Sequence, residues 1–205
     1  MSGEATSPPG SGCEYVVATS NPGKLREIRA ILVGESVQLS SLDSFPRVEF
    51  PVEGDDYSEN AIAKARAVAQ AIGRPALGDD SGLEVAGLDG APGPRSARFG
   101  GPGLDDAGRV AALLQRMNGM EGDDRAACFV CVAALVMPDG SVVTARGECA
   151  GRILSAPRGH GGFGYDPIFE AEGAAGTMAE LGESEKHRIS HRGQALRALW
   201  KAHRA

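Results

Sequence analysis

The stretch YVVATSNPGKLREIRAIL, residues 15–32, joins a short apolar run, a polar turn and an amphipathic segment. Its first five residues are mostly apolar and β-branched, which predicts a buried strand. The turn that follows contains proline and glycine, and Leu25, Ile28 and Leu32 then recur at the spacing of one helical face. A buried strand followed directly by a helix is the building unit of α/β proteins, so this stretch predicts the fold class.

The rest of the chain continues this pattern without an internal repeat. Strand and helix signals alternate irregularly, which favours a mixed β-sheet with flanking helices. No linker divides the chain, so we expect a flexible leader over residues 1–12 and a single domain over residues 13–205. The expected elements are a strand at 37–42, a helix at 56–71, a strand, turn and strand across 76–85, a helix near 110–117, a hairpin of 126–137 with 141–150, and a C-terminal helix.

Composition and charge narrow the classes of partner. The 205 residues carry a formal net charge of −6, and an acidic surface repels polyanions. We therefore expect no nucleic acid and no membrane as a partner. No apolar run approaches the roughly 20 residues of a membrane-spanning helix, and the N-terminus lacks the features of a signal peptide. These observations predict a cytoplasmic protein that remains compatible with a small phosphorylated ligand.

The spacing of Cys128 and Cys131 matches a CxxC motif, but both lie within the apolar run ACFVCVAALVM. Residues three apart in a strand point to opposite faces of the sheet, and no second CxxC pair completes a zinc site. We therefore expect free thiols that pack in the core of a protein from a reducing compartment.

Two segments in the first half of the chain have the composition of phosphate and metal sites. The turn at 19–24 lies between a strand and a helix, where backbone N–H groups and the helix dipole attract anions, and Lys24 adds a positive charge. An ordinary helix-capping turn explains that segment equally well. In GDDSG, residues 78–82, the adjacent carboxylates of Asp79 and Asp80 would be stabilised by a cation such as Mg²⁺. A solvated polar turn is the alternative there.

The segment GHGGFGYDP, residues 159–167, has the composition of a nucleobase site. Its glycines allow close approach of a ligand, and the rings of Phe163 and Tyr165 can stack on a base. Asp166 can accept hydrogen bonds from ring N–H groups. The alternative is a flexible hairpin end, which does not explain two aromatic rings beside a carboxylate.

The segment EKHRISHR, residues 185–192, is strongly basic. His187 and His191 have a spacing that can bind metal on one helical face, but the HExxH pattern is absent. A cationic helix start that faces an anionic or keto-bearing ligand is favoured over a zinc site. A solvated helix without a binding role is the remaining alternative.

Taken together, these segments resemble the family of inosine triphosphate pyrophosphatases, the Ham1-like pyrophosphatases of non-standard purine nucleoside triphosphates. The matching stretches, in the family's order, are VVATSNPGKLREI, SENAIAKARA, GDDSGLEVAGLDGAPGPRSARFGG, GGFGYDPIFE and TMAELGESEKHRISHRGQAL. They extend from Tyr15 to the C-terminus. The resemblance implies an α/β fold with a long central mixed sheet, flanking helices and two lobes around a substrate cleft, assembled as a homodimer.

The resemblance also implies a reaction and a set of site residues. The reaction is Mg²⁺-dependent hydrolysis of ITP, dITP and XTP to the nucleoside monophosphate and pyrophosphate, which would remove deaminated purines from the nucleotide pool. Asp80 would be the catalytic carboxylate and a metal ligand, and Phe163 would stack on the purine. The implied substrate-binding residues are Thr19, Ser20, Asn21, Pro22, Gly23, Lys24, Lys64, Ser81, Phe163, Gly164, Tyr165, Asp166, Lys186, His191 and Arg192.

The second metal ligand stays open at this point. The family usually has an acidic residue before a Gly-x-Thr-Phe stretch, whereas this chain reads VEGDDYSEN at 52–60. Glu53 is the candidate ligand, and Asp55 or Asp56 compete for the role. Two other functions also stay open, namely a nucleotide sensor without turnover and a pyrophosphatase for pyrimidine nucleotides.

Overall fold

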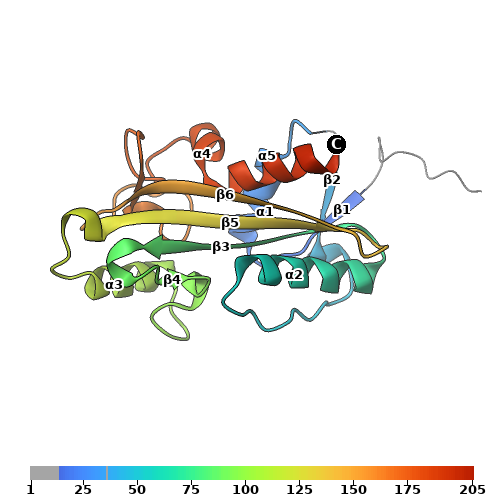
Figure 1. Ribbon diagram of the computed structural model, residues 1–205, viewed down its shortest axis with the longest axis horizontal. Coiled ribbons are helices and arrows are strands. Elements are labelled where there is room, and N and C mark those ends of the chain that lie inside the picture. Colours follow the sequence, from blue (N-terminus) through green and yellow to red (C-terminus); the bar gives the residue numbers. More distant parts are fainter. Residues whose placement is uncertain (1–13, 36) are drawn as a thin grey trace, which may run out of the picture.

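A computed structural model describes residues 14–35 and 37–205, and the predicted leader at 1–12 lies outside the described residues. One long sheet extends through the molecule, with helices on both faces (Figure 1). Its strand order is β2-β1-β3-β5-β6-β7, with β4 paired to β3. The strands are β1 (Glu14–Val17), β2 (Gln38–Ser41), β3 (Ala76–Val85), β4 (Pro92–Gly93), β5 (Ala126–Val136), β6 (Val142–Ile153) and β7 (Phe169–Ala171).

Strand directions confirm the predicted mixed sheet. β1 is parallel to both β2 and β3, whereas β3, β5, β6 and β7 pair in antiparallel fashion. In Figure 1, α2 lies below the sheet and α5 above it. The helices are α1 (Pro22–Ile31), α2 (Tyr57–Ile72), α3 (Asp106–Arg116), α4 (Glu183–Ile189) and α5 (His191–His203). Short 3-10 helices are η1 (Leu42–Ser44), η2 (Ala86–Leu88), η3 (Ser96–Arg98), η4 (Gly122–Arg125) and η5 (Asp166–Ile168).

Local chemistry explains where α2 begins and ends. The side chain of Asp56 accepts a hydrogen bond from the backbone N–H of Glu59 at 2.8 Å, as the sequence predicts for a helix cap. Gly73 ends the helix in the left-handed conformation, with φ of 72°. These two signals fix the length of the helix that carries Lys64.

The predicted strand, turn and strand across 76–85 is wrong, because this segment is one continuous strand. β3 pairs with β5 along its whole length, from Ala76 opposite Val136 to Val85 opposite Ala127. The unbroken ladder with a long apolar partner outweighs the turn preference of GDDSG. Because successive side chains of a strand alternate between faces, Asp79 and Asp80 point to opposite sides of the sheet.

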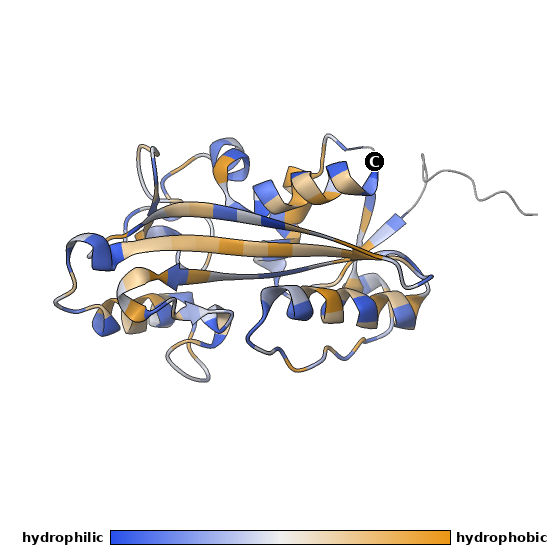
Figure 2. Ribbon diagram, in the orientation of Figure 1, coloured by the Kyte–Doolittle hydropathy of each residue, from blue (hydrophilic) through white to orange (hydrophobic). Residues whose placement is uncertain are grey.

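Hydrophobic residues of the sheet pack into cores at both ends of the molecule, and β5 is apolar along most of its length (Figure 2). One core joins β1, the start of β3 and β5 to α1 and α5, and α2 packs on the opposite face. The other core joins the end of β3 to α3, β7 and the segment after β6. These two bodies of packed residues are the two lobes of the fold.

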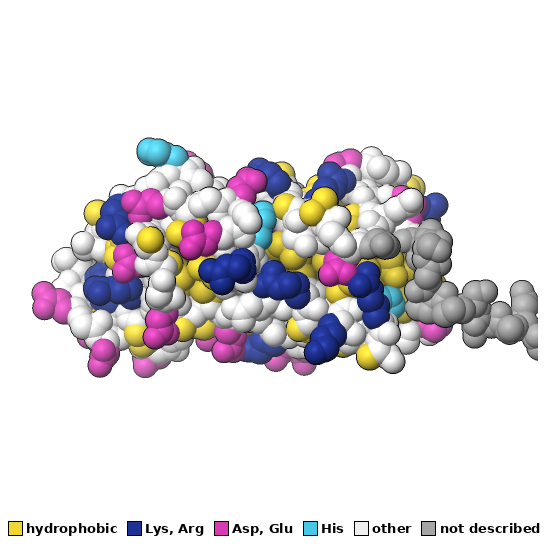
Figure 3. Space-filling model, turned by 90° about the horizontal axis from the view of Figure 1, so that it is seen from above, with side chains coloured by type: hydrophobic (Ala, Val, Ile, Leu, Met, Phe, Trp, Pro, Cys, Tyr) yellow, Lys and Arg dark blue, Asp and Glu magenta, His cyan; other side chains and the backbone are white. Residues whose placement is uncertain are grey.

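The face of the molecule seen from above gives little indication of a site. Seen from above, basic, acidic and hydrophobic side chains lie intermixed (Figure 3). Within the described residues, no helix has the length and apolar character needed to cross a membrane.

Glycine allows α5 to lie directly on β6. A Cβ atom at Gly147 would come within 2.2 Å of the carbonyl oxygen of His191 and 2.4 Å of the backbone nitrogen of Ala195. Both atoms belong to the backbone of α5, so neither can move without displacing the helix.

We expect Gly147→Ala to lower the free energy of unfolding by about 1–3 kcal/mol, because the added methyl group forces α5 away from the sheet. Urea denaturation followed by circular dichroism measures the change. Gly34→Ala is the matched control, since a Cβ atom there meets nothing within 4 Å. Equal stability of the two variants would contradict the close packing of α5 on β6.

Candidate active site

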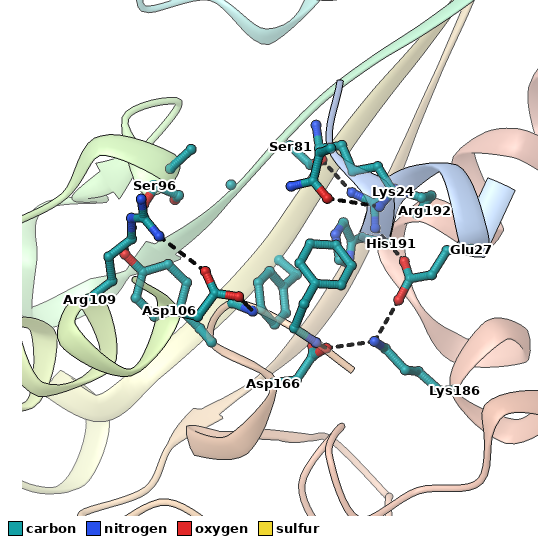
Figure 4. Close-up of a pocket in the computed structure, with 17 residues that line it drawn as sticks. Lys24, Glu27, Ser81, Ser96, Asp106, Arg109, Asp166, Lys186, His191 and Arg192 are labelled. Carbon is teal, nitrogen blue, oxygen red and sulfur yellow. Dashed lines mark hydrogen bonds and ion pairs between the residues drawn. The ribbon is translucent and has the colours of Figure 1, made fainter. Parts of the chain in front are cut away.

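A cleft of about 180 Å³ lies between the two lobes (Figure 4). Residues from α1, β3, α3, α4 and α5 line it, so both lobes contribute to its walls. Most of the predicted substrate-binding residues are among the lining residues: Asn21, Lys24, Ser81, Phe163, Gly164, Tyr165, Asp166, Lys186, His191 and Arg192. The predicted residues Thr19, Ser20, Pro22, Gly23, Lys64, Glu53 and Asp80 do not line this cleft.

Asp79 points to the cleft side of β3 and is buried among cations. Its carboxylate lies 3.0 Å from Nζ of Lys24 and 3.2 Å from Nη2 of Arg192. The hydroxyl of Ser81 also donates to it, at 2.9 Å. Burial alone would raise the pKa of Asp79, but Lys24 and Arg192 hold that pKa far below its usual range. Asp79 is therefore an ionised carboxylate that orients two cations.

Glu27 extends this ion network toward the C-terminal helices. Its two carboxylate oxygens pair with Arg192 and with Lys186, whose Nζ is 2.6 Å away. Lys186 in turn lies 2.6 Å from Asp166. Burial alone would raise the pKa of Glu27, but Arg192 and Lys186 lower it. All of these side chains are buried, so the network fixes the donors on this wall before any ligand binds.

Phe163 lies between the network and α1. Its ring centre is 5.4 Å from Nζ of Lys186 and 5.6 Å from Cζ of Arg192. A Cβ atom at Gly23 would come within 2.9 Å of this ring, so glycine permits the close approach. The ring therefore lines the cleft next to two cations.

His191 forms the floor of the cleft beside Phe129. The two rings stack with centres 4.7 Å apart and planes inclined by 10°. Within the described residues, its Nδ1 atom is buried without a hydrogen-bond partner. Burial, together with Arg192 and Lys186, lowers the pKa of His191 well below its usual value. A neutral imidazole therefore lines the cleft.

The turn at 19–24 differs from its sequence-based description. The side chain of Asn21 accepts from the backbone N–H groups of Gly23 at 2.8 Å and Lys24 at 3.1 Å, and the hydroxyl of Thr19 accepts from the N–H of Asn21. The expectation that these N–H groups are free for an anion is wrong, because Asn21 caps α1 itself.

Asp80 lies on the other face of β3, where α2 meets the sheet. Its carboxylate accepts from Nζ of Lys64 and from the amide of Asn60, both at 2.9 Å. Lys64 also donates to Glu53 at 2.8 Å, so the carboxylates of Asp80 and Glu53 converge on one ammonium group. Burial would lower the pKa of Lys64, but Asp79 and Asp80 raise it, so this ammonium keeps its proton.

The competing ligand candidates have other partners. Asp55 is exposed and accepts two 2.7 Å hydrogen bonds from Arg95, and Asp56 caps α2. Within the described residues, neither of these carboxylates shares a cation with Asp80. Of the three candidates, Glu53 is the one that shares an ammonium group with Asp80.

Several cleft residues, among them Glu27, Asp106 and Arg109, escaped the sequence analysis, and the predicted residue Tyr165 lies differently from what was expected. Asp106 accepts from the backbone N–H of Gly164 at 2.7 Å and pairs with Arg109 at 3.1 Å, which ties α3 to the glycine-rich segment. The hydroxyl of Tyr165 donates to the carbonyl of Ser96, so this ring is buried against the wall rather than free for stacking. Only Glu27 had a usable signal, because it lies three residues after Lys24 on the same helical face.

Comparison with known proteins identifies the family of the chain. A family model described as the Ham1 family matches residues 15–202. The chain belongs to the Ham1 family. A protein of Thermus thermophilus named dITP/XTP pyrophosphatase is 49% identical over 94% of this chain and 93% of its own length. One of Deinococcus deserti with the same name is 50% identical over 94% of this chain and 90% of its own length.

Solved structures of the family share the fold. A HAM1 protein from Coxiella burnetii superposes with a TM-score of 0.81 and 40% identity, covering 93% of this chain and 98% of its own. A Mycobacterium abscessus structure, named nucleoside-triphosphatase / dITP/XTP pyrophosphatase, has a TM-score of 0.72 and 42% identity, covering 91% and 97% of the two chains. The resemblance drawn from the motifs is thereby confirmed.

We expect Glu27→Gln to destabilise the protein by about 3–5 kcal/mol at pH 7, because it leaves buried Lys186 and Arg192 without a shared carboxylate. Urea denaturation measures this change. Glu148→Gln is the control, since Glu148 pairs with Arg146 on the surface, and we expect it to cost less than about 1 kcal/mol. Similar losses in both variants would show that the buried pairs of Glu27 contribute no more than a surface ion pair.

The lowered pKa of Glu27 also predicts how stability depends on pH. A folded-state pKa below the unfolded value of 4.5 gives stabilisation that is complete above that pH and is lost as the pH falls through the folded pKa. Wild-type stability should therefore fall more steeply below pH 4.5 than that of Glu27→Gln. Parallel curves from denaturation at several pH values would contradict this account.

Proposed function

We propose that this protein hydrolyses the non-standard purine nucleoside triphosphates ITP, dITP and XTP to the nucleoside monophosphate and pyrophosphate, and so removes deaminated purines from the nucleotide pool. The main support is the division of the site by β3. Hydrogen-bond donors for a base line one face of this strand, and carboxylates suited to phosphate chemistry lie on the other. The names of the Thermus thermophilus and Deinococcus deserti relatives support the same reaction.

Asp80 and Glu53 have the donor chemistry of a Mg²⁺ site. Both are carboxylates, and both approach the same ammonium group, so their oxygens already converge on a positive charge. No group of three or more acidic, histidine or cysteine side chains suited to a metal is found in the described residues. Two carboxylates fit Mg²⁺, which takes its remaining ligands from water and substrate phosphates. Bound there, Mg²⁺ would neutralise phosphate charge and make pyrophosphate a better leaving group.

Asp80 is the candidate catalytic base. Lys64 and Asn60 fix its carboxylate, which would orient a water molecule and accept its proton as the water oxygen attacks the α-phosphorus. The bond from the α-phosphorus to the oxygen that bridges it to the β-phosphorus breaks, and its electron pair leaves with pyrophosphate. Lys24 and Lys64 would stabilise the charge on the departing phosphates.

The donors on the cleft wall explain a preference for 6-keto purines. Hypoxanthine and xanthine carry an oxygen at the 6-position where adenine carries an amino group. Lys186 and Arg192 can donate to that oxygen but oppose an amino group, as does His191 when its N–H faces the base. Because these donors are buried and held in place by carboxylates, the amino group of adenine would be set against N–H groups that cannot turn away from it, which is costly. We place this reaction in the cytoplasm and propose that the enzyme is a homodimer.

We expect Asp80→Asn to bind dITP with Mg²⁺ but to release pyrophosphate at least about 1,000-fold more slowly, since it removes the base and a metal ligand. Glu53→Gln should raise the Mg²⁺ concentration needed for half-maximal rate. Asp55→Asn is the control, because its carboxylate pairs with Arg95 on the surface. Near-normal turnover by Asp80→Asn would refute its assignment, and a higher Mg²⁺ requirement in Asp55→Asn alone would transfer the ligand role to Asp55.

Arg192→Lys tests the base contact while keeping a positive charge. Lysine cannot reproduce the contacts that the guanidinium makes with Asp79, Glu27 and Ser81. We expect the ratio of kcat/KM for dITP to that for dATP to fall about tenfold. An unchanged ratio in a folded variant would show that Arg192 does not contribute to selectivity.

A further inference from the structure

A second cavity lies outside the cleft, at the end of the sheet where β5 begins and β6 ends. Its volume is about 390 Å³, and η4, the end of β6 and the segment that follows β6 form its walls. We call it the arginine cavity, because its lining includes three arginines: Arg125, Arg152 and Arg158, with Glu121, Ser155 and Ala156 beside them. None of these residues lines the cleft, so the arginine cavity is a separate place on the molecule.

Arg125 is held in place by backbone carbonyl groups. Its guanidinium donates to the carbonyl oxygens of Ile153 and Leu154 at 2.7 Å and to that of Met120 at 3.2 Å. Carbonyl groups carry no net charge, and no carboxylate in the described part of the chain forms an ion pair with Arg125. A guanidinium has five N–H donors, so this half-buried group keeps two donors and an uncompensated positive charge.

The other two arginines differ in how far carboxylates neutralise them. Nη2 of Arg158 lies 2.9 Å from the carboxylate of Glu170, and its Nε lies 3.4 Å from that of Glu180. Arg152 is exposed and, over residues 14–35 and 37–205, forms no ion pair and no side-chain hydrogen bond. Over the same ranges, the acidic lining residue Glu121 pairs with none of the three arginines. The arginine cavity therefore carries two positive charges that no carboxylate offsets.

The segment after β6 adds uncharged donors to this cavity. The backbone N–H groups of Leu154 and Arg158 each donate to a carbonyl oxygen of η5 at 2.8 Å, which fixes both ends of the segment. Between these ends, the N–H groups of Ser155 and Ala156 and the hydroxyl of Ser155 have no hydrogen-bond partner among the described residues. Unpaired backbone N–H groups in a turn are typical of anion-binding concavities.

We propose that the arginine cavity binds a phosphate-type dianion, at a site separate from the cleft. Two uncompensated guanidinium groups match the charge of a dianion, and a guanidinium presents paired N–H groups that fit two phosphate oxygens. The N–H and hydroxyl groups of the neighbouring segment supply further donors. A tetrahedral oxyanion can accept from donors on several sides, whereas a carboxylate accepts mainly in its own plane. The dianion would be free inorganic phosphate or the phosphate group of a nucleotide.

Calorimetric titration of the full-length protein with inorganic phosphate, at low salt and with EDTA present, tests the proposal. We expect Arg152→Ala to weaken phosphate binding about fivefold or more and Arg152→Glu to abolish it. Arg152 is exposed and unpaired in the described chain, so both variants should keep wild-type thermal stability without phosphate. Arg29→Ala is the matched control, because Arg29 is an exposed arginine of α1 away from the arginine cavity, and we expect its phosphate affinity within about twofold of wild type.

Titration with dAMP distinguishes the two sources of the dianion. An affinity for dAMP no higher than that for phosphate assigns the arginine cavity to free phosphate. Tighter binding of dAMP that is lost in Arg152→Ala assigns it to the phosphate group of a nucleotide.

Unchanged phosphate affinity in Arg152→Ala would overturn the proposal, as would no binding of millimolar phosphate by the wild type. An equal loss in Arg29→Ala would also overturn it, because the effect would then be one of general surface charge. Titration with dIMP supplies the last criterion. We expect Arg152→Ala to bind dIMP as the wild type does, and a loss equal to that for phosphate would overturn the proposal, because both ligands would then share one site.

Discussion

The carboxylates of Asp79 and Asp80 are adjacent in β3, and the alternation of a strand sends them into opposite layers of the molecule. Each is nearly inaccessible to solvent, and a buried carboxylate without partners would be strongly destabilising. Asp79 therefore requires Lys24 and Arg192 from α1 and α5, and Asp80 requires Lys64 from α2. As a result, α1 and α5 supply cations on one face of β3, and α2 supplies a cation on the other face. The rest of the site is arranged around these contacts.

The two faces of the sheet therefore carry different groups, with buried hydrogen-bond donors on the cleft side and a pair of carboxylates on the other side. On the cleft side, the network through Glu27 holds Lys186 and Arg192 with their donors already oriented, so a base meets a fixed pattern rather than mobile side chains. On the other side, Lys64 keeps two carboxylates together at a place suited to a metal. Because β3 passes through both lobes, in the proposed reaction it would link recognition of the base to the position of the phosphates.

Much of the site could be predicted from sequence because its residues occur in short, unusual segments, whereas the contacts depend on distant elements. The composition of GDDSG predicts a turn, since nothing in the local sequence shows that β5 pairs with all of it. The capping role of Asn21 explains the turn better than free N–H groups do. Asp106 and Phe129 come from a helix and a strand with ordinary hydrophobic patterns, so only the packed fold brings them to the cleft.

The most direct test of the account is an assay of the purified protein with Mg²⁺ and each of dITP, XTP, dATP, dGTP and dCTP, in which pyrophosphate and orthophosphate are measured separately. The account predicts pyrophosphate from dITP and XTP, little product from the other nucleotides, and no product after addition of EDTA. Release of orthophosphate alone would contradict it, because the terminal phosphate would then be the one removed. Equal release of pyrophosphate from all five nucleotides would contradict the role assigned to the buried donors of the cleft.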